Sequence, residues 1–228
     1  MQRRYLASGD RMVLVEFPEE ISQEVNSQVH EMAAVVETTR IPGVVEWVPA
    51  YRTLGIVYNP METSFRSLIE SLEQIEGLGG QAQAGRSRRI EIPVSYGGEM
   101  GPDLDFVAQH NQLTTDEVIR LHTASEYLVY LLGFTPGFPY LGGMAPEIAA
   151  PRLEEPRSHV PAGSVAIGGS QTGIYPIESP GGWRIIGRTP LKLFDLSRNS
   201  PFLLKAGDSV RFLSITLEEF QRFEQLTE

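Results

Sequence analysis

The sequence of 228 residues contains no cysteine. This absence excludes disulfides, thiolate zinc sites and a cysteine nucleophile, so any catalysis by the chain has to use oxygen or nitrogen groups. Lysine is also scarce. Only Lys192 and Lys205 occur among the 19 basic residues, which leaves two candidates for amine or Schiff-base chemistry.

The chain also lacks an apolar run of about 18 residues, the length that a membrane-spanning helix needs. Its first residues, Met1 to Tyr5, lead into charged residues rather than into the hydrophobic segment of a signal peptide. We therefore expect a cytoplasmic protein that does not bind a membrane. The formal net charge of −10 disfavours nucleic-acid binding, because phosphate recognition requires clustered lysine and arginine on one face.

Hydrophobic periodicity predicts a small α/β unit in the first third of the chain. Apolar residues recur at helical spacing in two segments, and three other runs are rich in β-forming residues. The predicted order is β-α-β-β-α, which matches a ferredoxin-like plan with helices packed on one face of an antiparallel sheet. The segments, in chain order, are residues 11–17, 19–40, 44–50, 53–59 and 62–76.

A linker is predicted over residues 77–85, where glycine, alanine and glutamine dominate. With a boundary near Arg86, the predicted domains are residues 1–85 and 86–228. Beyond the boundary we expect a strand, then two short helices, the second with Thr114 and Glu117 at capping-box spacing. Short β-like runs separated by glycine and proline turns then predict a small barrel. These segments are 89–96, 103–110, 116–123, 126–134, 164–167, 173–177, 183–186, 191–196 and 209–213.

Glycine and proline concentrate between Gly133 and Pro190, which hold 11 of the 22 glycines and 9 of the 16 prolines. Rigid loops that allow close approach to a ligand are typical of a binding site. A barrel of short strands also needs many turns, however, so composition alone is compatible with either explanation.

The same stretch carries charged, polar and aromatic side chains that suit a site. Two arginines could clamp a carboxylate or carboxyphosphate, a histidine could transfer a proton near neutral pH, and an amide or phenol could orient a carbonyl. A histidine is also commonly structural, and an arginine in a proline-rich loop commonly braces backbone carbonyls. The candidates are Arg157, His159, Gln171, Tyr175, Ser179, Trp183, Arg184 and Arg188.

Three common catalytic signatures are missing from the chain. The segment from Gly168 to Gly173 differs from a nucleophile elbow, because Thr172 stands where the second glycine is required. Neither lysine follows a glycine, so no phosphate-binding P-loop is present. The sequence also has no H-E-x-x-H helix or other dense group of ligands, and we predict no metal in this chain.

Long ordered motifs carry a resemblance to a known family. Over nearly its whole length the chain closely resembles the B-type subunits of 5-oxoprolinase, also called the KipI or allophanate hydrolase subunit 1 family. The motifs are Pro49-Ala-Tyr-Arg52, Ile92-Pro-Val-Ser-Tyr-Gly-Gly98, Gly101-Pro-Asp-Leu104, Gly133-Phe-Thr-Pro-Gly-Phe-Pro-Tyr-Leu-Gly-Gly143, Pro151-Arg-Leu-Glu-Glu-Pro-Arg-Ser-His-Val-Pro-Ala-Gly-Ser-Val-Ala-Ile-Gly168, Ile174-Tyr-Pro-Ile-Glu-Ser-Pro-Gly-Gly-Trp183 and Gly187-Arg-Thr-Pro190.

The resemblance implies an α+β protein with an N-terminal ferredoxin-like domain and a C-terminal cyclophilin-like β-barrel. It also implies two partners: a second subunit of the KipA or allophanate hydrolase subunit 2 type, and a LamB/YcsF-like subunit. Together such subunits open 5-oxoproline, a small-molecule substrate, to L-glutamate at the expense of ATP. With no P-loop in this chain, ATP is expected to be used by the complex.

Two alternatives follow from other members of the same family. One resembles an inhibitor of a histidine kinase, and a related fused pair forms the carboxyltransferase part of a biotin-dependent urea carboxylase. Within the 5-oxoprolinase hypothesis, we predict catalytic roles for His159, Gln171 and Tyr175. The predicted substrate-binding residues are Arg157, Arg188, Ser179 and Trp183.

Overall fold

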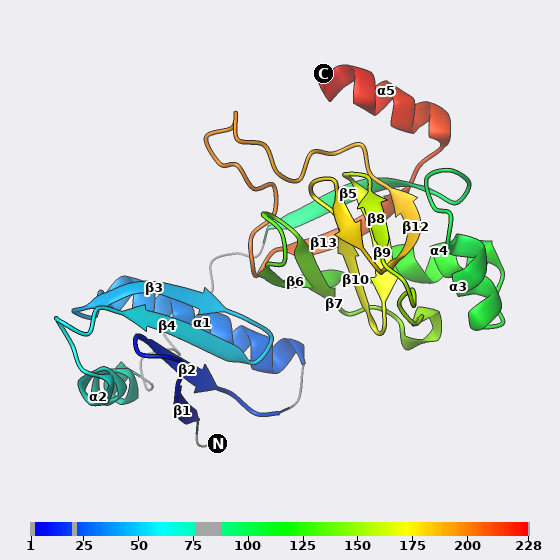
Figure 1. Cartoon of the computed structure of the whole chain (residues 1–228). Helices are drawn as coiled ribbons and strands as arrows, with labels where there is room; N and C mark the ends of the chain where they lie inside the picture. The colour runs from blue at the N-terminus through cyan, green and yellow to red at the C-terminus, as the bar shows by residue number, and fades with distance from the viewer. Residues whose placement is uncertain (1–2, 20–21, 76–87, 228) are drawn as a thin grey trace. The chain divides into compact units, whose positions relative to one another are not determined.

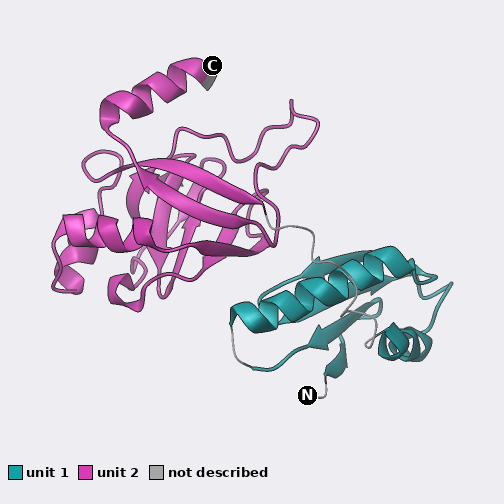
Figure 2. Cartoon of the chain, turned by 180° about the vertical axis from the view of Figure 1, so that it is seen from behind, with its two compact units in different colours: residues 1–87 teal, residues 88–228 magenta. Residues whose placement is uncertain are grey.

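The computed structural model describes residues 3–19, 22–75 and 88–227. The chain divides into two compact units, residues 1–87 and 88–228, shown in separate colours in Figure 2. The predicted linker over residues 77–85 and the boundary near Arg86 lie outside the described residues. Among the described residues, no helix has both the length and the apolar character needed to cross a membrane.

The first unit is a four-stranded antiparallel sheet packed against two helices (Figure 1). Its sheet order is β1-β2-β4-β3, and inward residues of β2 and β4 share one core with the apolar faces of the helices. The elements are β1 (Arg4–Ala7), β2 (Met12–Glu16), α1 (Gln23–Thr39), β3 (Val44–Pro49), β4 (Thr53–Tyr58) and α2 (Phe65–Ile75).

Strand β1 is not among the elements that periodicity predicts. It has only four residues and pairs with β2 as an antiparallel hairpin, from Arg4 opposite Glu16 to Ala7 opposite Val13. A run this short carries too little alternation to be recognised without its partner. The remaining β-α-β-β-α order is observed as predicted.

The second unit is a closed seven-stranded barrel, with strand order β10-β7-β6-β13-β5-β12-β9 and closure between β9 and β10. All pairs are antiparallel except β13 with β5, which is parallel. The barrel strands are β5 (Arg89–Tyr96), β6 (Tyr127–Leu132), β7 (Pro139–Gly142), β9 (Ser164–Gly168), β10 (Gln171–Ile174), β12 (Arg184–Arg188) and β13 (Ser209–Ser214).

Further elements of the second unit surround the barrel (Figure 1). The predicted capping box is present: Thr114 Oγ1 accepts from the Glu117 backbone N–H, and the Glu117 carboxylate accepts from the Thr114 N–H. The elements are α3 (Leu104–His110), α4 (Thr115–Ala124), the 3-10 helix η2 (Pro146–Ile148), the two-stranded sheet of β8 (Arg157–Val160) and β11 (Ser179–Gly181), and α5 (Leu217–Thr227).

The predicted fold class, a ferredoxin-like α/β unit followed by a cyclophilin-like β-barrel, is confirmed. The strand predicted over residues 191–196 is wrong, because only a single bridge between Phe194 and Phe202 forms there. The seven barrel strands already pair in a ring, so this segment finds no free edge. Its Leu193 is nevertheless buried against the barrel core.

A buried histidine links α4 to the inside of the barrel. His122 Nδ1 lies 2.8 Å from Tyr96 Oη, and Nε2 lies 3.0 Å from Thr172 Oγ1. Because Thr172 Oγ1 donates to the Ala166 carbonyl, it accepts from His122, which assigns a neutral ring whose Nδ1 accepts from Tyr96. Full burial lowers the pKa of His122 to about 3.

Because the pKa of His122 is lowered to about 3 in the fold and is near 6.5 in the unfolded chain, the unfolded state binds the extra proton between these values. The free energy of unfolding therefore keeps its full value above about pH 6.5. It decreases as the pH falls below this value, because protonation of His122 favours the unfolded chain. In chemical denaturation, His122 is expected to make the free energy of unfolding about 2 kcal/mol lower at pH 5 than at pH 7. In His122→Gln this component should disappear, and an unchanged pH dependence in that variant would contradict the assignment.

Candidate functional site

The barrel unit contains a cavity of about 340 Å³ with largely aromatic walls. It lies where β7, the end of β10, β11 and the residue before β12 come together. We call it the aromatic pocket. The side chains that give it its character are Phe134, Phe138, Tyr140, Arg152, Tyr175 and Trp183.

Phe138 is the centre of the aromatic packing. Its ring meets Tyr175 and Trp183 edge-on, with centroid distances of 5.2 and 5.5 Å, and tilts against Tyr140 at 5.0 Å. Edge-to-face geometry is the favoured arrangement of aromatic pairs and limits their rotamers. Phe134, by contrast, is 66% exposed and extends the aromatic surface outward. The pocket thus has a rigid apolar wall of packed rings and is open to solvent on the side of Phe134.

Two glycines permit this packing. A Cβ at Gly168 would lie 2.6 Å from the Trp183 indole, and a Cβ at Gly181 would overlap the Tyr175 phenol. Any larger residue would therefore push one of the two rings out of place. This requirement accounts for two of the glycines in the dense Gly133 to Pro190 stretch.

Arg152 lies at the aromatic pocket, and Arg184 holds the chain segment that contains Arg152. The Arg152 guanidinium carbon is 5.5 Å from the centroid of the Trp183 ring, within the range of a cation–π contact. Arg184 Nε donates to the carbonyl of the residue before Arg152, Pro151, at 3.1 Å. The aromatic pocket therefore combines a flat apolar wall with a nearby positive charge, which suits a small planar ligand that carries an anionic group.

Tyr175 adds a polar atom to the wall. Burial raises the pKa of its phenol above the ordinary value, and a hydrogen bond with the Trp183 backbone opposes part of this rise. The phenol is therefore protonated at neutral pH and can donate to a carbonyl or carboxylate oxygen.

Arg157 lies beside this pocket and donates to a buried carboxylate. Its Nη1 and Nη2 donate to Asp103 Oδ2 and Oδ1 at 2.8 and 2.9 Å. Asp103 Oδ2 also accepts from the backbone N–H of Ile185 at 2.7 Å. Two of the donors that a carboxylate clamp would use are thus engaged within the protein, and Arg157 does not line the aromatic pocket.

The remaining predicted residues do not converge on one point. His159 is exposed and its Nδ1 lies 3.3 Å from the Glu178 carboxylate, while Gln171 begins β10 opposite Gly168. The buried Ser179 Oγ in β11 has no hydrogen-bond partner in the described part of the chain. Of the seven predicted site residues, the structure brings Tyr175 and Trp183 together, whereas Arg188 lines a different cavity.

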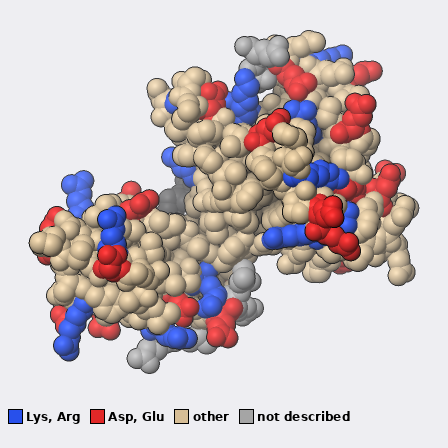
Figure 3. All heavy atoms as spheres, in the orientation of Figure 1, with Lys and Arg blue, Asp and Glu red and all other residues tan. Residues whose placement is uncertain are grey.

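Residue-level reasoning missed Arg152, Phe138 and Tyr140. All three lie in the quoted motifs, and aromatics at positions 134, 138 and 140 are a visible cluster in the sequence. What the sequence does not show is that the segment around Arg152 lies next to Trp183. Among the residues in the described ranges, no three histidine, aspartate or glutamate side chains are grouped so as to hold a metal ion. Acidic and basic side chains are interspersed on the face seen in Figure 3.

Arg157→Ala and His159→Ala should separate a structural role from a binding role. Arg157→Ala leaves the buried Asp103 carboxylate short of two donors, so we expect a loss of about 2 to 3 kcal/mol in the free energy of unfolding. His159→Ala removes an exposed contact and should change it by less than about 0.5 kcal/mol. Chemical denaturation of both variants tests this. Equal free energies of unfolding would show that the hydrogen bonds from Arg157 to Asp103 do not stabilise the fold.

Comparison with known proteins places this architecture in a family. The family model described as "Carboxyltransferase domain, subdomain C and D" matches residues 3–204. The chain is 46% identical over 231 residues to the B-type subunit of 5-oxoprolinase from Bacillus subtilis, covering 95% of each chain. To the same subunit of Escherichia coli O157:H7 it is 43% identical over 218 residues, covering 93% of this chain and 97% of the relative.

Solved structures agree with this grouping. The crystal structure of TTHA0988 superposes with a TM-score of 0.79 at 41% identity, covering 90% of this chain. This chain spans 40% of the length of that protein. The extent of the family-model match and the identity to full-length relatives lead to one conclusion: the chain belongs to the family of B-type 5-oxoprolinase subunits.

Proposed function

We propose that this chain is a subunit of an ATP-dependent 5-oxoprolinase, which opens 5-oxoproline to L-glutamate. Its proposed partners are a second subunit of the KipA or allophanate hydrolase subunit 2 type and a LamB/YcsF-like subunit. The observation that carries the proposal is the identity of 46% and 43%, over nearly the full length, to relatives named as B-type subunits of 5-oxoprolinase.

The aromatic pocket supports this proposal through its chemistry. The substrate, 5-oxoproline, is a small five-membered lactam with one carboxylate. Its ring would lie against the side chains of Phe138, Tyr140 and Trp183, and its carboxylate would pair with Arg152. The protonated Tyr175 phenol would donate to the amide oxygen, where negative charge grows as the amide is activated. A pocket of about 340 Å³ is at the small end of ligand sites, as such a substrate requires.

The pocket by itself is an incomplete active site. The predicted proton-transfer group, His159, is paired with Glu178 on an exposed strand and does not line the pocket. ATP provides the driving force for opening the amide. In this proposal the chain binds and orients the lactam, and the partner subunits contribute the nucleotide site and the attacking water.

Reconstitution tests the proposed activity. The purified chain alone is expected to release no glutamate, whereas a mixture with both partner subunits should release glutamate from 5-oxoproline only when ATP is present. Absence of turnover with all three subunits and ATP would exclude the proposed function.

Within the reconstituted complex, Arg152→Ala should weaken substrate binding. Loss of a charge-assisted hydrogen bond to a carboxylate is expected to raise KM for 5-oxoproline about tenfold or more. Tyr175→Phe should instead lower kcat, because the phenol acts on charge that develops during the reaction. Steady-state kinetics with thermal denaturation of each variant gives both quantities.

Arg66→Ala is the matched control for Arg152→Ala, since Arg66 is a 91% exposed arginine on α2 that pairs only with Glu70 at 3.7 Å among the described residues. The control should leave KM and kcat unchanged. If Arg152→Ala also leaves KM unchanged in a complex that is active, the aromatic pocket does not bind the substrate carboxylate.

A further inference from the structure

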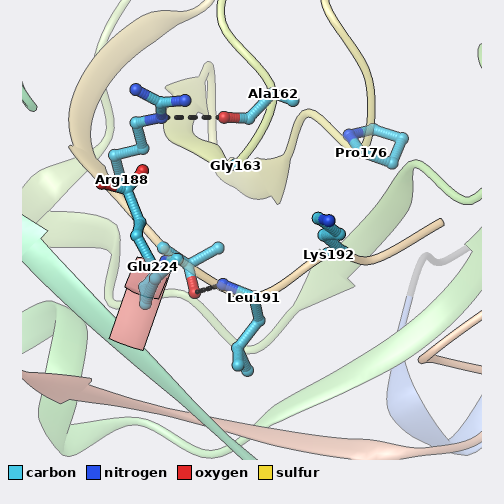
Figure 4. Close-up of a pocket in the computed structure, with 9 residues that line it drawn as sticks. Ala162, Gly163, Pro176, Arg188, Leu191, Lys192 and Glu224 are labelled. Atoms are coloured by element: carbon cyan, nitrogen blue, oxygen red, sulfur yellow. Dashed lines mark hydrogen bonds between the residues drawn. The ribbon is translucent and has the colours of Figure 1, made fainter. Parts of the chain in front are cut away.

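A second cavity, of about 300 Å³, lies between the end of β12 and helix α5 (Figure 4). Three charged side chains line it: Arg188, Lys192 and Glu224. Its remaining walls come from the turn at Ala162 and Gly163, from Pro176 and from the segment that follows β12. We call it the charged pocket. In Figure 4, Arg188 and Lys192 lie on opposite sides of it.

The guanidinium of Arg188 is held in place before any ligand arrives. Its backbone pairs with both neighbouring strands, opposite Ser95 of β5 and Ser164 of β9. Its Nε donates to the Ala162 carbonyl at 2.9 Å, which restricts rotation of the guanidinium. In the described part of the chain the two terminal nitrogens of Arg188 make no hydrogen bond or ion pair. A fixed fork of N–H groups is the geometry that matches a carboxylate.

The segment after Arg188 is also held by backbone contacts. Thr189 is buried and its backbone N–H donates to the Gly163 carbonyl at 2.9 Å. Gly163 has a φ of +82°, and a Cβ there would overlap the Thr189 carbonyl oxygen. This close approach of two turns forms one wall of the charged pocket, and Pro190 and Leu191 connect it to Lys192.

Helix α5 brings the acidic group to the charged pocket. Its first turn is capped at Thr216, whose Oγ1 accepts from the Glu219 N–H at 3.2 Å. Phe220 is fully buried and anchors the helix, with the Arg188 guanidinium carbon 6.0 Å from the centroid of its ring. Glu224 is one turn further along, so it lies on the same helix face as Phe220 and reaches the cavity.

The lining of the charged pocket therefore contains two positive groups and one negative group. An acidic amino acid carries the complementary set, two carboxylates and one ammonium group. We propose that this cavity is a binding site for an α-amino dicarboxylate, with Arg188 and Lys192 on the carboxylates and Glu224 on the ammonium group. The ligand class deepens the proposed function and rests on it, because the product of that reaction, L-glutamate, belongs to this class.

Binding is measurable on the purified chain without partners or ATP. Titration calorimetry at low ionic strength with L-glutamate is expected to show saturable binding. Glutarate has the two carboxylates without the ammonium group and should bind at least about tenfold more weakly. Inorganic phosphate distinguishes a general anion site from the proposed one.

Separate variants test the contributions of Lys192 and Glu224. Lys192→Met keeps the alkyl chain and removes the charge, and it should weaken L-glutamate binding about tenfold or more. Lys205→Met is the matched control, since Lys205 is the other lysine, is exposed and does not line the cavity. Glu224→Gln should abolish the preference for L-glutamate over glutarate. Circular dichroism and thermal denaturation confirm that each variant is folded.

Two outcomes would overturn the proposal. One is the absence of saturable L-glutamate binding at millimolar concentration by the folded wild-type chain. The other is equal binding of L-glutamate, glutarate and phosphate, with no effect of Glu224→Gln, which would indicate a general anion site. These results are independent of the reconstitution assay. An active complex in which this chain does not bind L-glutamate refutes only this site, whereas an inactive complex with selective binding refutes only the proposed reaction.

Discussion

The buried carboxylate of Asp103 connects the parts of the barrel unit that form the aromatic pocket. It receives two N–H groups from Arg157 in β8 and one from the Ile185 backbone in β12. Its own backbone N–H donates to the Ile185 carbonyl at 2.8 Å. A carboxylate shielded from water at this depth is tolerated only when such donors surround it. The start of α3 is thereby joined to two strands that are distant in the sequence.

The same connection extends to the binding residues. Arg184 lies 3.9 Å from the Asp103 carboxylate, stacks over Phe106 at 3.5 Å and donates to the Pro151 carbonyl. The neighbours of these anchored residues, Trp183 and Arg152, line the aromatic pocket. At Gly101 the chain passes so close to β12 that a Cβ would overlap the Ile186 carbonyl. The segment from Gly101 to Leu104 therefore does not line the aromatic pocket, but its contacts hold β12 and the neighbouring pocket residues in place.

The two cavities are adjacent through a single stretch of backbone. Tyr175 lines the aromatic pocket, and the next residue, Pro176, lines the charged pocket. The Tyr175 backbone is held on both sides, since its N–H donates to Ser164 and its carbonyl accepts from Gly163. Substrate recognition in one cavity and amino-acid recognition in the other would thus share a rigid support.

Elements whose signal is local could be predicted from the sequence. Helical spacing located α1 and α2, the Thr114 and Glu117 pair located the start of α4, and alternating runs located most barrel strands. These signals depend on residues three or four apart, or on alternate residues, so neighbours in the chain are sufficient to encode them. The fold class and the family followed from these elements and from long motifs. Short strands rich in glycine and proline, such as β7 and β11, carry too little alternation to be recognised this way.

Which side chains meet could not be predicted from the sequence and is known from the folded chain. Arg157 and Asp103 are 54 residues apart, and His122 and Thr172 are 50 apart, so nothing local to either residue indicates the partner. Barrel closure left residues 191–196 without a strand partner, and the packing against Trp183 brought Arg152 to the aromatic pocket. The packing of α5 against the barrel unit places Glu224 in the same cavity as Arg188 and Lys192. Contacts of this kind depend on how the closed barrel folds the chain back on itself, a property of the whole unit that no single segment contains.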